Sequence, residues 1–210
     1  MDWATFASLA TAFGTLVLAI ATFLSIRSAN RSARVAERAL LAGLRPMLGA
    51  SRFEDPMQKI RFVDGHWVRA QGGHGVAEVA GGVVYLAIPV RNAGSGIAVL
   101  DAWYPHPDLP LGATDHAPVR DFRRLTRDLY VAAGDLGFWQ GALRDPSEAM
   151  YAGVLEAVVE RRGFSVDLLY GDHEGGQRAI TRFALFPIGD EDWLASVTRH
   201  WSLDRTDPRH

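Results

Sequence analysis

Histidine and carboxylate side chains in two stretches are the residues of this sequence best suited to chemistry. His106 and His116 lie in a proline-rich segment, and Asp172 and His173 lie in a predicted turn between two strands. Imidazole and carboxylate groups bind divalent metals, so these side chains could form the centre of a metal-dependent hydrolase. Their spacing matches no metal-binding motif, and polar residues at a turn are commonly just solvated. The sequence therefore predicts no metal site, and the hydrolase remains an alternative.

Other catalytic and cofactor-binding patterns do not occur in the sequence. The chain has no cysteine and no GxSxG motif, and residues 94–96 are better explained as a turn than as a nucleophile. No phosphate-binding GxxxxGKS or GxxxxGKT motif is present, and no GxGxxG opens a helix after a strand. The sequence thus predicts no catalytic residue, no cofactor and no enzymatic activity. A formal net charge of -2 without a broad basic face also argues against nucleic acid as a partner.

Two tryptophans near the C-terminus are candidates for a docking surface. Trp193, Val197 and Trp201 recur at helical spacing, so residues 191–200 are predicted to form a helix. Tryptophan is generally highly buried, which favours a place in the core for both rings. If Trp193 and Trp201 instead face solvent, they form a docking surface, because aromatic side chains are enriched in interfaces.

The elements that position these residues begin with an apolar N-terminal segment. No charged residue and no proline occurs from residue 3 to residue 26. A helix of about 24 residues is about 36 Å long, which is enough to cross the hydrocarbon core of a bilayer. Serine and threonine hydroxyls in it can bond to carbonyls one turn earlier. A buried core helix and a cleaved signal peptide are the alternatives. Uniform apolarity and the lack of preceding positive charge favour an uncleaved transmembrane anchor.

Positive charge after the apolar segment predicts its orientation. Arg27, Arg31, Arg34 and Arg38 follow it closely, whereas only Asp2 precedes it with charge. Because positive residues stay on the cytoplasmic side, the N-terminus is expected outside and the rest of the chain in the cytoplasm. The protein is therefore predicted to be a single-pass protein of the inner (plasma) membrane. The arginines are expected to contact anionic head groups of the lipid bilayer, its first predicted partner.

Small residues repeat along the same predicted helix at heptad spacing. Such residues let helix backbones approach closely, which is how helices associate in lipid. The pattern predicts either a homo-oligomer or a membrane-protein partner, although a segment rich in Ala and Thr can show it by chance. The candidate seam for helix association consists of Ser8, Ala12, Thr15, Ala19, Thr22, Ala29, Ala33 and Ala36.

The remaining chain is predicted to be mainly β, with residues 1–45 as the transmembrane and juxtamembrane helix. Residues 46–203, about the size of one ordinary domain, contain short alternating segments separated by turns, which is typical of an antiparallel β-sandwich. The clearest strand is 82–92, and the clearest hairpin pairs 164–170 with 178–186. A second hairpin is expected about Asp64–Gly65. Two short accessory helices are expected at 145–162 and 191–200, and 204–210 is expected to be a flexible tail.

Four stretches give the sequence a familiar order. They are RPML after a basic membrane-proximal helix, VRNAGSGIAVL, GDLGFWQGAL and VDLLYGDHEGGQRAITRF. The chain resembles a group of uncharacterised bacterial single-pass membrane proteins with an immunoglobulin-like soluble part. The resemblance rests on residues 92–94 and 170–172 and covers most of the chain. It implies an immunoglobulin-like architecture and no catalytic residues.

Together these observations predict a membrane-anchored, cytoplasm-facing binding or scaffold protein, or an accessory subunit, without catalytic activity. An oligomeric membrane effector built through the helix seam is the first alternative. A metal-dependent hydrolase around His106, His116 and His173 is the second.

Overall fold

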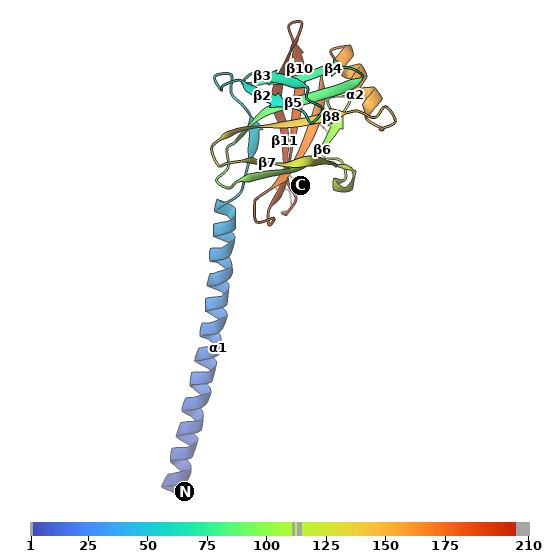
Figure 1. Cartoon of the computed structure of the whole chain (residues 1–210). Coiled ribbons are helices and arrows are strands. Elements are labelled where there is room, and N and C mark those ends of the chain that lie inside the picture. The colour runs from blue at the N-terminus through green and yellow to red at the C-terminus, as the bar shows by residue number, and fades with distance from the viewer. Residues whose placement is uncertain (1, 111, 113–114, 205–210) are drawn as a thin grey trace. The chain divides into compact units, whose positions relative to one another are not determined.

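The computed structural model describes residues 2–110, 112 and 115–204, and it divides the chain into two units (Figure 1). The first unit is Met1–Gly43 and the second is Leu44–His210. Residues 205–210 of the expected tail lie outside the described residues.

The first unit is a single helix, α1 (Trp3–Gly43). Its segment Thr11–Glu37 has a mean hydropathy of 1.6 and is exposed along its length, so α1 is an apolar helix long enough to cross a membrane. The hydroxyls of Thr11, Thr15 and Thr22 donate to carbonyls one turn earlier at 2.8–2.9 Å, as predicted. These bonds satisfy the hydroxyls within the helix, which lowers their cost in an apolar medium.

The second unit is mainly β, as predicted from the alternating segments. Its described residues form the helix α2 (Tyr151–Val159), a short 3-10 helix η1 (Val119–Asp121) and eleven strands. The strands are β1 (Leu48–Ala50), β2 (Gln58–Arg61), β3 (Trp67–Ala70), β4 (His74–Ala80), β5 (Val83–Asn92), β6 (Ala98–His106), β7 (Arg123–Val131), β8 (Leu136–Leu143), β9 (Phe164–Gly171), β10 (Arg178–Ile188) and β11 (Asp192–Ser202).

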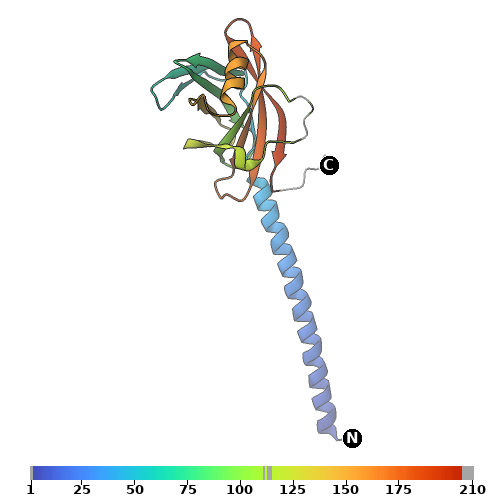
Figure 2. The same cartoon turned by 90° about the vertical axis from the view of Figure 1, so that its right-hand side faces the viewer.

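Nine of these strands form one antiparallel, curled sheet in the order β1-β5-β4-β11-β10-β9-β6-β7, with β8 paired to β5. A short ladder joins its two parts, because β4 meets β11 only at Gly75–Trp193 and His74–Leu194. The hairpin β2–β3 is separate and lies to one side of the sheet (Figure 2). The predicted antiparallel β architecture is therefore confirmed at the level of a curled sheet.

Alternation along the strands divides the sheet into an inner and an outer face. Val84 and Leu86 of β5 and Val166 and Leu168 of β9 point into one core, which Val154 of α2 helps to close. The outer face of β5 is covered by the hairpin β2–β3, and the outer face of β9 carries a different cluster. That second outer face holds the candidate site.

Both predicted hairpins are present. β9 pairs with β10 from Phe164–Leu185 to Gly171–Arg178, and β2 pairs with β3 about the turn at 64–65. The strand predicted at 82–92 is β5. These elements combine clear alternation with strong turn residues, which is why local sequence was sufficient to find them.

The prediction of a helix at 191–200 is wrong, because this segment forms strand β11. Trp193, Val197 and Trp201 satisfy helical spacing, but the chain turns at Gly189, where φ is 53°, and runs back along β10. The long ladder with β10 outweighs the helical pattern, since propensity is a weak prior against tertiary pairing.

The helix predicted at 145–162 exists but is shorter, from Tyr151 to Val159. Asp145 closes a turn with Ser147 instead of capping the helix. The chain leaves the helix through Arg161, whose φ is 52°, and not through Gly163. Its guanidinium donates to the carbonyls of Ile188, Gly189 and Asp192 and lies 5.1 Å from the Trp193 ring. These contacts offset the cost of a left-handed arginine.

Candidate functional site

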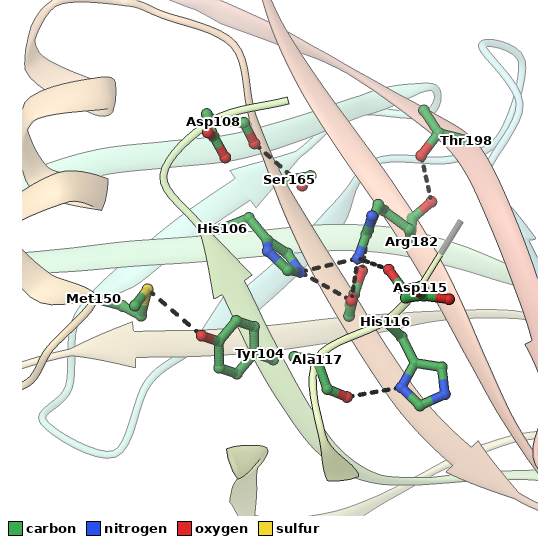
Figure 3. A network of polar contacts seen from close by, with 11 residues as sticks. Tyr104, His106, Asp108, Asp115, His116, Ala117, Met150, Ser165, Arg182 and Thr198 are labelled. Atoms are coloured by element: carbon green, nitrogen blue, oxygen red, sulfur yellow. Dashed lines mark hydrogen bonds and ion pairs between the residues drawn. The ribbon is translucent and has the colours of Figure 1, made fainter. Parts of the chain in front are cut away.

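An ion-pair network lies on the outer face of β6, β9 and β10. Because side chains alternate along each strand, His106, Asp167 and Arg182 all point to this face, opposite the main core. Asp167 and Arg182 are directly opposite each other in the ladder between β9 and β10. Figure 3 shows His106 and Arg182 pointing toward one another.

Asp167 is held by two donors. Arg182 donates from Nε to Oδ1 at 2.6 Å and from Nη2 to Oδ2 at 2.7 Å. His106 places its Nε2 2.9 Å from the same Oδ2, so the imidazole that carries its proton on Nε2 also donates to the carboxylate. A two-point contact between guanidinium and carboxylate is the strongest and most directional form of this ion pair.

The network is removed from water. Asp167 is 0% exposed and Arg182 is 3% exposed. Burial by itself raises the pKa of Asp167, but the hydrogen bonds and positive charge of Arg182 and His106 outweigh it and lower the pKa below the ordinary value. Asp167 is therefore a buried, ionised carboxylate, and its charge is balanced by the guanidinium.

The proline-rich loop between β6 and η1 covers the network. The carbonyl of Asp115 accepts from Arg182 Nη2 at 3.5 Å, and Ser165 Oγ donates to the carbonyl of Asp108 at 3.3 Å (Figure 3). The Trp201 ring lies 4.9 Å from the Arg182 guanidinium carbon. Arg182 thus sits between an aromatic ring, a carboxylate and the loop.

A small pocket of about 160 Å³ opens beside the network. Arg182, Arg199, Ser165 and Thr198 contribute polar groups to it, with Leu109 and Ala184 as apolar walls. Arg182 makes its hydrogen bonds through Nε and Nη2, and Nη1 has no hydrogen-bond partner among the described residues. The pocket therefore combines two guanidinium groups with an N–H donor that remains available.

The histidines and acids predicted as weak metal ligands do not come together. His106 belongs to the ion-pair network, and His116 contacts the carbonyl of Ala117 at 2.7 Å. Asp172 accepts from the backbone of Gly176 in the turn after β9, and His173 faces Glu174 in that turn. Within residues 2–110, 112 and 115–204, no three metal-ligating side chains form a group.

The two tryptophans proposed for docking are not on an exposed helix face. Trp193 is 1% exposed and Trp201 is 6% exposed, both on β11. Trp193 packs into the main core and donates from Nε1 to the carbonyl of Ala77. Trp201 packs against the outer face beneath Arg182. The docking alternative required outward-facing rings, and this condition does not hold.

The candidate residues of α1 lie on its exposed surface. The eight seam residues are exposed along the helix, as are Arg27, Arg31 and Arg34. The side chain of Arg38 lies outside the described residues.

Asp167 and Arg182 were not identified as site residues from the sequence. Asp167 is the one charged residue of FSVDLLY, and Arg182 is the one buried charged residue of RAITRFALF, whose Arg178 is exposed. Charged residues are rarely buried unless they are paired, so two such residues in one predicted hairpin are the signal that could have found them.

Comparisons with known proteins provide no name for this arrangement. No protein-family model matches the sequence, and no curated protein and no solved structure matches the chain.

Proposed function

We propose that this chain is a membrane-anchored binding protein that holds a small anionic ligand without transforming it. The observation that carries the proposal is Arg182 Nη1, which has no hydrogen-bond partner among the described residues and lies beside Arg199 in the pocket. A guanidinium that is already oriented by Asp167 presents its remaining N–H groups without further ordering, which favours binding of a carboxylate or phosphate.

Charge and size both support an anion of few atoms. Arg182 and Arg199 place two guanidinium groups at the pocket wall, and Asp167 is ion-paired with the first. The hydroxyls of Ser165 and Thr198 are further polar groups there. Pockets for drug-sized ligands measure roughly 300–1,000 Å³, whereas this pocket measures about 160 Å³. A carboxylate or phosphate of small size suits it better than a nucleotide.

The experiment measures binding of inorganic phosphate and of succinate to the full-length protein in detergent by calorimetry. Sodium chloride at equal ionic strength is the reference. We expect saturable binding of at least one probe, and at least tenfold weaker binding by Arg199→Gln. Arg120→Gln removes an arginine whose side chain is 85% exposed, and it should change nothing. Absence of saturable binding, or equal losses in both variants, would contradict the proposal.

In this proposal α1 is an uncleaved anchor in the plasma membrane, with the β domain in the cytoplasm. The arginines after the apolar segment support that orientation. Because the chain has no cysteine, Val63→Cys, at a side chain that is 71% exposed, provides one labelling site. Protection from a membrane-impermeant reagent in intact cells is expected, and labelling there would reverse the orientation.

A second candidate is an oligomeric membrane effector assembled through α1. Arg27, Arg31 and Arg34 follow one stripe of the helix, and Ala29, Ala33 and Ala36 follow another, offset by two residues or about 200°. When two copies of α1 pack closely through their alanine stripes, the arginines of the two helices therefore stay apart. Mass measurement in gentle detergent should then give a fixed oligomer that Ala33→Leu disrupts and Ser28→Leu preserves, whereas a monomer would exclude this candidate.

The proposal also includes a relation between the β domain and immunoglobulin-like domains. Strands β1, β4, β5 and β8 form one part of the curled sheet and β6, β7, β9, β10 and β11 form the other, with one core between them. Two facing parts are compatible with a sandwich of that kind. An experimental structure of this chain that superposes on a solved immunoglobulin-like domain would support the relation.

A further inference from the structure

A second hollow of the β domain is a groove that shares no lining residue with the Arg182 pocket, although β11 contributes to both. It measures about 660 Å³ and lies between β3, β4 and the start of β11. Three consecutive residues of β3 line it, namely Trp67, Val68 and Arg69. Because side chains alternate between faces, consecutive lining residues mean that the strand presents its edge to the groove.

That edge of β3 has free hydrogen-bonding groups. β3 pairs with β2 alone, in a separate two-stranded sheet. Just outside the ladder Phe62 N donates to His66 O, so these two residues form a hydrogen-bonded pair. Arg61 and Trp67 are the next pair along the two strands. Since bonded and non-bonded pairs alternate in an antiparallel ladder, the N–H and C=O of Trp67 and Arg69 point away from β2. No backbone bond joins these groups to another described residue.

The groove also offers apolar contact. Trp67 is 59% exposed and Met57 is 48% exposed, and both line the groove. The guanidinium of Arg61 lies 5.8 Å from the Trp67 ring, so the ring already accepts a cation on one side. Exposed tryptophan of this kind is the residue most enriched among binding hot spots.

The far wall of the groove is acidic. Glu191 and Asp192 are exposed at the start of β11, and Glu78 lies on β4 paired to His66. Neither Glu191 nor Asp192 has an ion-pair partner in the part of the chain that the structure describes. Arg161 holds this wall in place by donating to the carbonyl of Asp192. Arg69, which also lines the groove, carries one positive charge, so the net charge of Glu191, Asp192 and Arg69 is negative.

We infer that the groove binds a basic, extended segment of a partner protein, which adds a strand to the free edge of β3. Its backbone pairs with Trp67 and Arg69, an apolar side chain packs on Trp67, and a lysine or arginine faces Glu191 and Asp192. Main-chain bonds supply affinity in such strand addition, and the flanking side chains supply specificity. The groove shares no lining residue with the Arg182 pocket, and its partner is opposite in charge to the anion proposed there.

The test uses the full-length protein in detergent and two synthetic probes, the peptides KVKVKV and EVEVEV. We expect KVKVKV to bind, as read by calorimetry and tryptophan fluorescence, and EVEVEV not to bind. Trp67→Ala and the pair Glu191→Gln with Asp192→Asn should each weaken binding at least tenfold. Tyr130→Ala removes another aromatic ring, 62% exposed on β7, and should leave binding unchanged.

The role of the strand edge is tested by two variants at one position. Arg69→Pro removes the N–H that faces the groove without removing a bond to β2, whereas Arg69→Ala keeps that N–H. Binding should be lost in the first and kept in the second, with thermal unfolding confirming that both fold. Failure of KVKVKV to bind, equal binding of EVEVEV, or equal behaviour of the two Arg69 variants would overturn the inference.

Discussion

Asp167 and Arg182 face each other across neighbouring strands and share two parallel hydrogen bonds of 2.6 and 2.7 Å, at a place where neither is exposed to water. Breaking a buried pair by removing one partner leaves an uncompensated charge. We therefore expect Asp167→Asn or Arg182→Met alone to destabilise the domain by about 3–5 kcal/mol. Urea unfolding followed by circular dichroism measures this.

The double variant Asp167→Leu with Arg182→Met separates stability from function. Replacing both charges with apolar side chains of similar volume is often neutral, so this variant should be much more stable than either single variant. It should nevertheless lose binding of the anionic probe. A double variant as unstable as the single ones would mean that the pair is required for folding.

Acid should weaken the domain through Asp167 in a defined range. The pKa of Asp167 is lower in the folded chain than the ordinary 3.8, so its contribution is complete above pH 3.8 and is lost as the pH falls through the lower folded value. The free energy of unfolding should change little between pH 7 and 5 from this group and fall below about pH 4. The apolar double variant should show a shallower fall, and identical pH profiles would contradict this assignment.

The pKa of a second carboxylate, Asp64, can be measured directly. Burial acts to raise the pKa of Asp64, but hydrogen bonds from Tyr85 at 2.8 Å and from Arg144 at 2.9 Å lower it to about 2. Tyr85→Phe removes one donor, so the pKa of Asp64 should rise toward 3.8. Carbon-detected NMR titration reads the carboxyl group directly, and an unchanged pKa would assign the shift to Arg144 and the backbone N–H of His66.

Asn92 should be the most sensitive uncharged polar residue of the domain. It is 0% exposed, and its side chain makes four hydrogen bonds. Oδ1 accepts from the backbone of Met47 and Gly94, and Nδ2 donates to the carbonyls of Gly96 and Val131. Asn92→Leu leaves all four backbone groups without this partner, at a cost of about 3 kcal/mol or more in unfolding free energy. Thermal unfolding measures this loss, and a cost below about 1 kcal/mol for Asn92→Leu would contradict the count.

Gly96 should tolerate no side chain. A Cβ at this position would lie 1.7 Å from the carbonyl oxygen of Leu44, which is backbone and cannot move aside cheaply. At Gly49 the nearest atom would be 4.0 Å away. Gly96→Ala should therefore lower the unfolding temperature by several degrees while Gly49→Ala leaves it nearly unchanged. Equal effects of the two variants would show that the segment at Leu44 can shift.

Local sequence was sufficient for elements whose pattern and turns agree. β5 has clean alternation between turn residues, and the hairpins about residues 64–65 and 171–177 have strong turn signals. β11 was misassigned because Trp193, Val197 and Trp201 fit a helix equally well, and only pairing with β10 decides between the two. Such pairing depends on residues distant in sequence.

The candidate site was harder to predict for the same reason. His106 was selected for its chemistry, but its partners Asp167 and Arg182 are 61 and 76 residues away in the chain. Their contact depends on the order β10-β9-β6, in which a hairpin closes against an earlier strand. Strand order follows from the whole core and not from a local pattern, so the charged pair could be suspected but not placed.

The residues around Asn92 also have a mechanical consequence. A pull along the chain from α1 reaches the β domain at Leu44–Leu48, where Arg45 O accepts from Ser95 N and Met47 O accepts from Ala93 N. Leu48 then starts the ladder with β5. Bonds in an antiparallel ladder lie across the strand, so tension along β1 shears them together and not one after another. The segment Leu44–Leu48, which Asn92 binds through the backbone N–H of Met47, thus joins α1 to the β domain at a point where force is shared among several bonds.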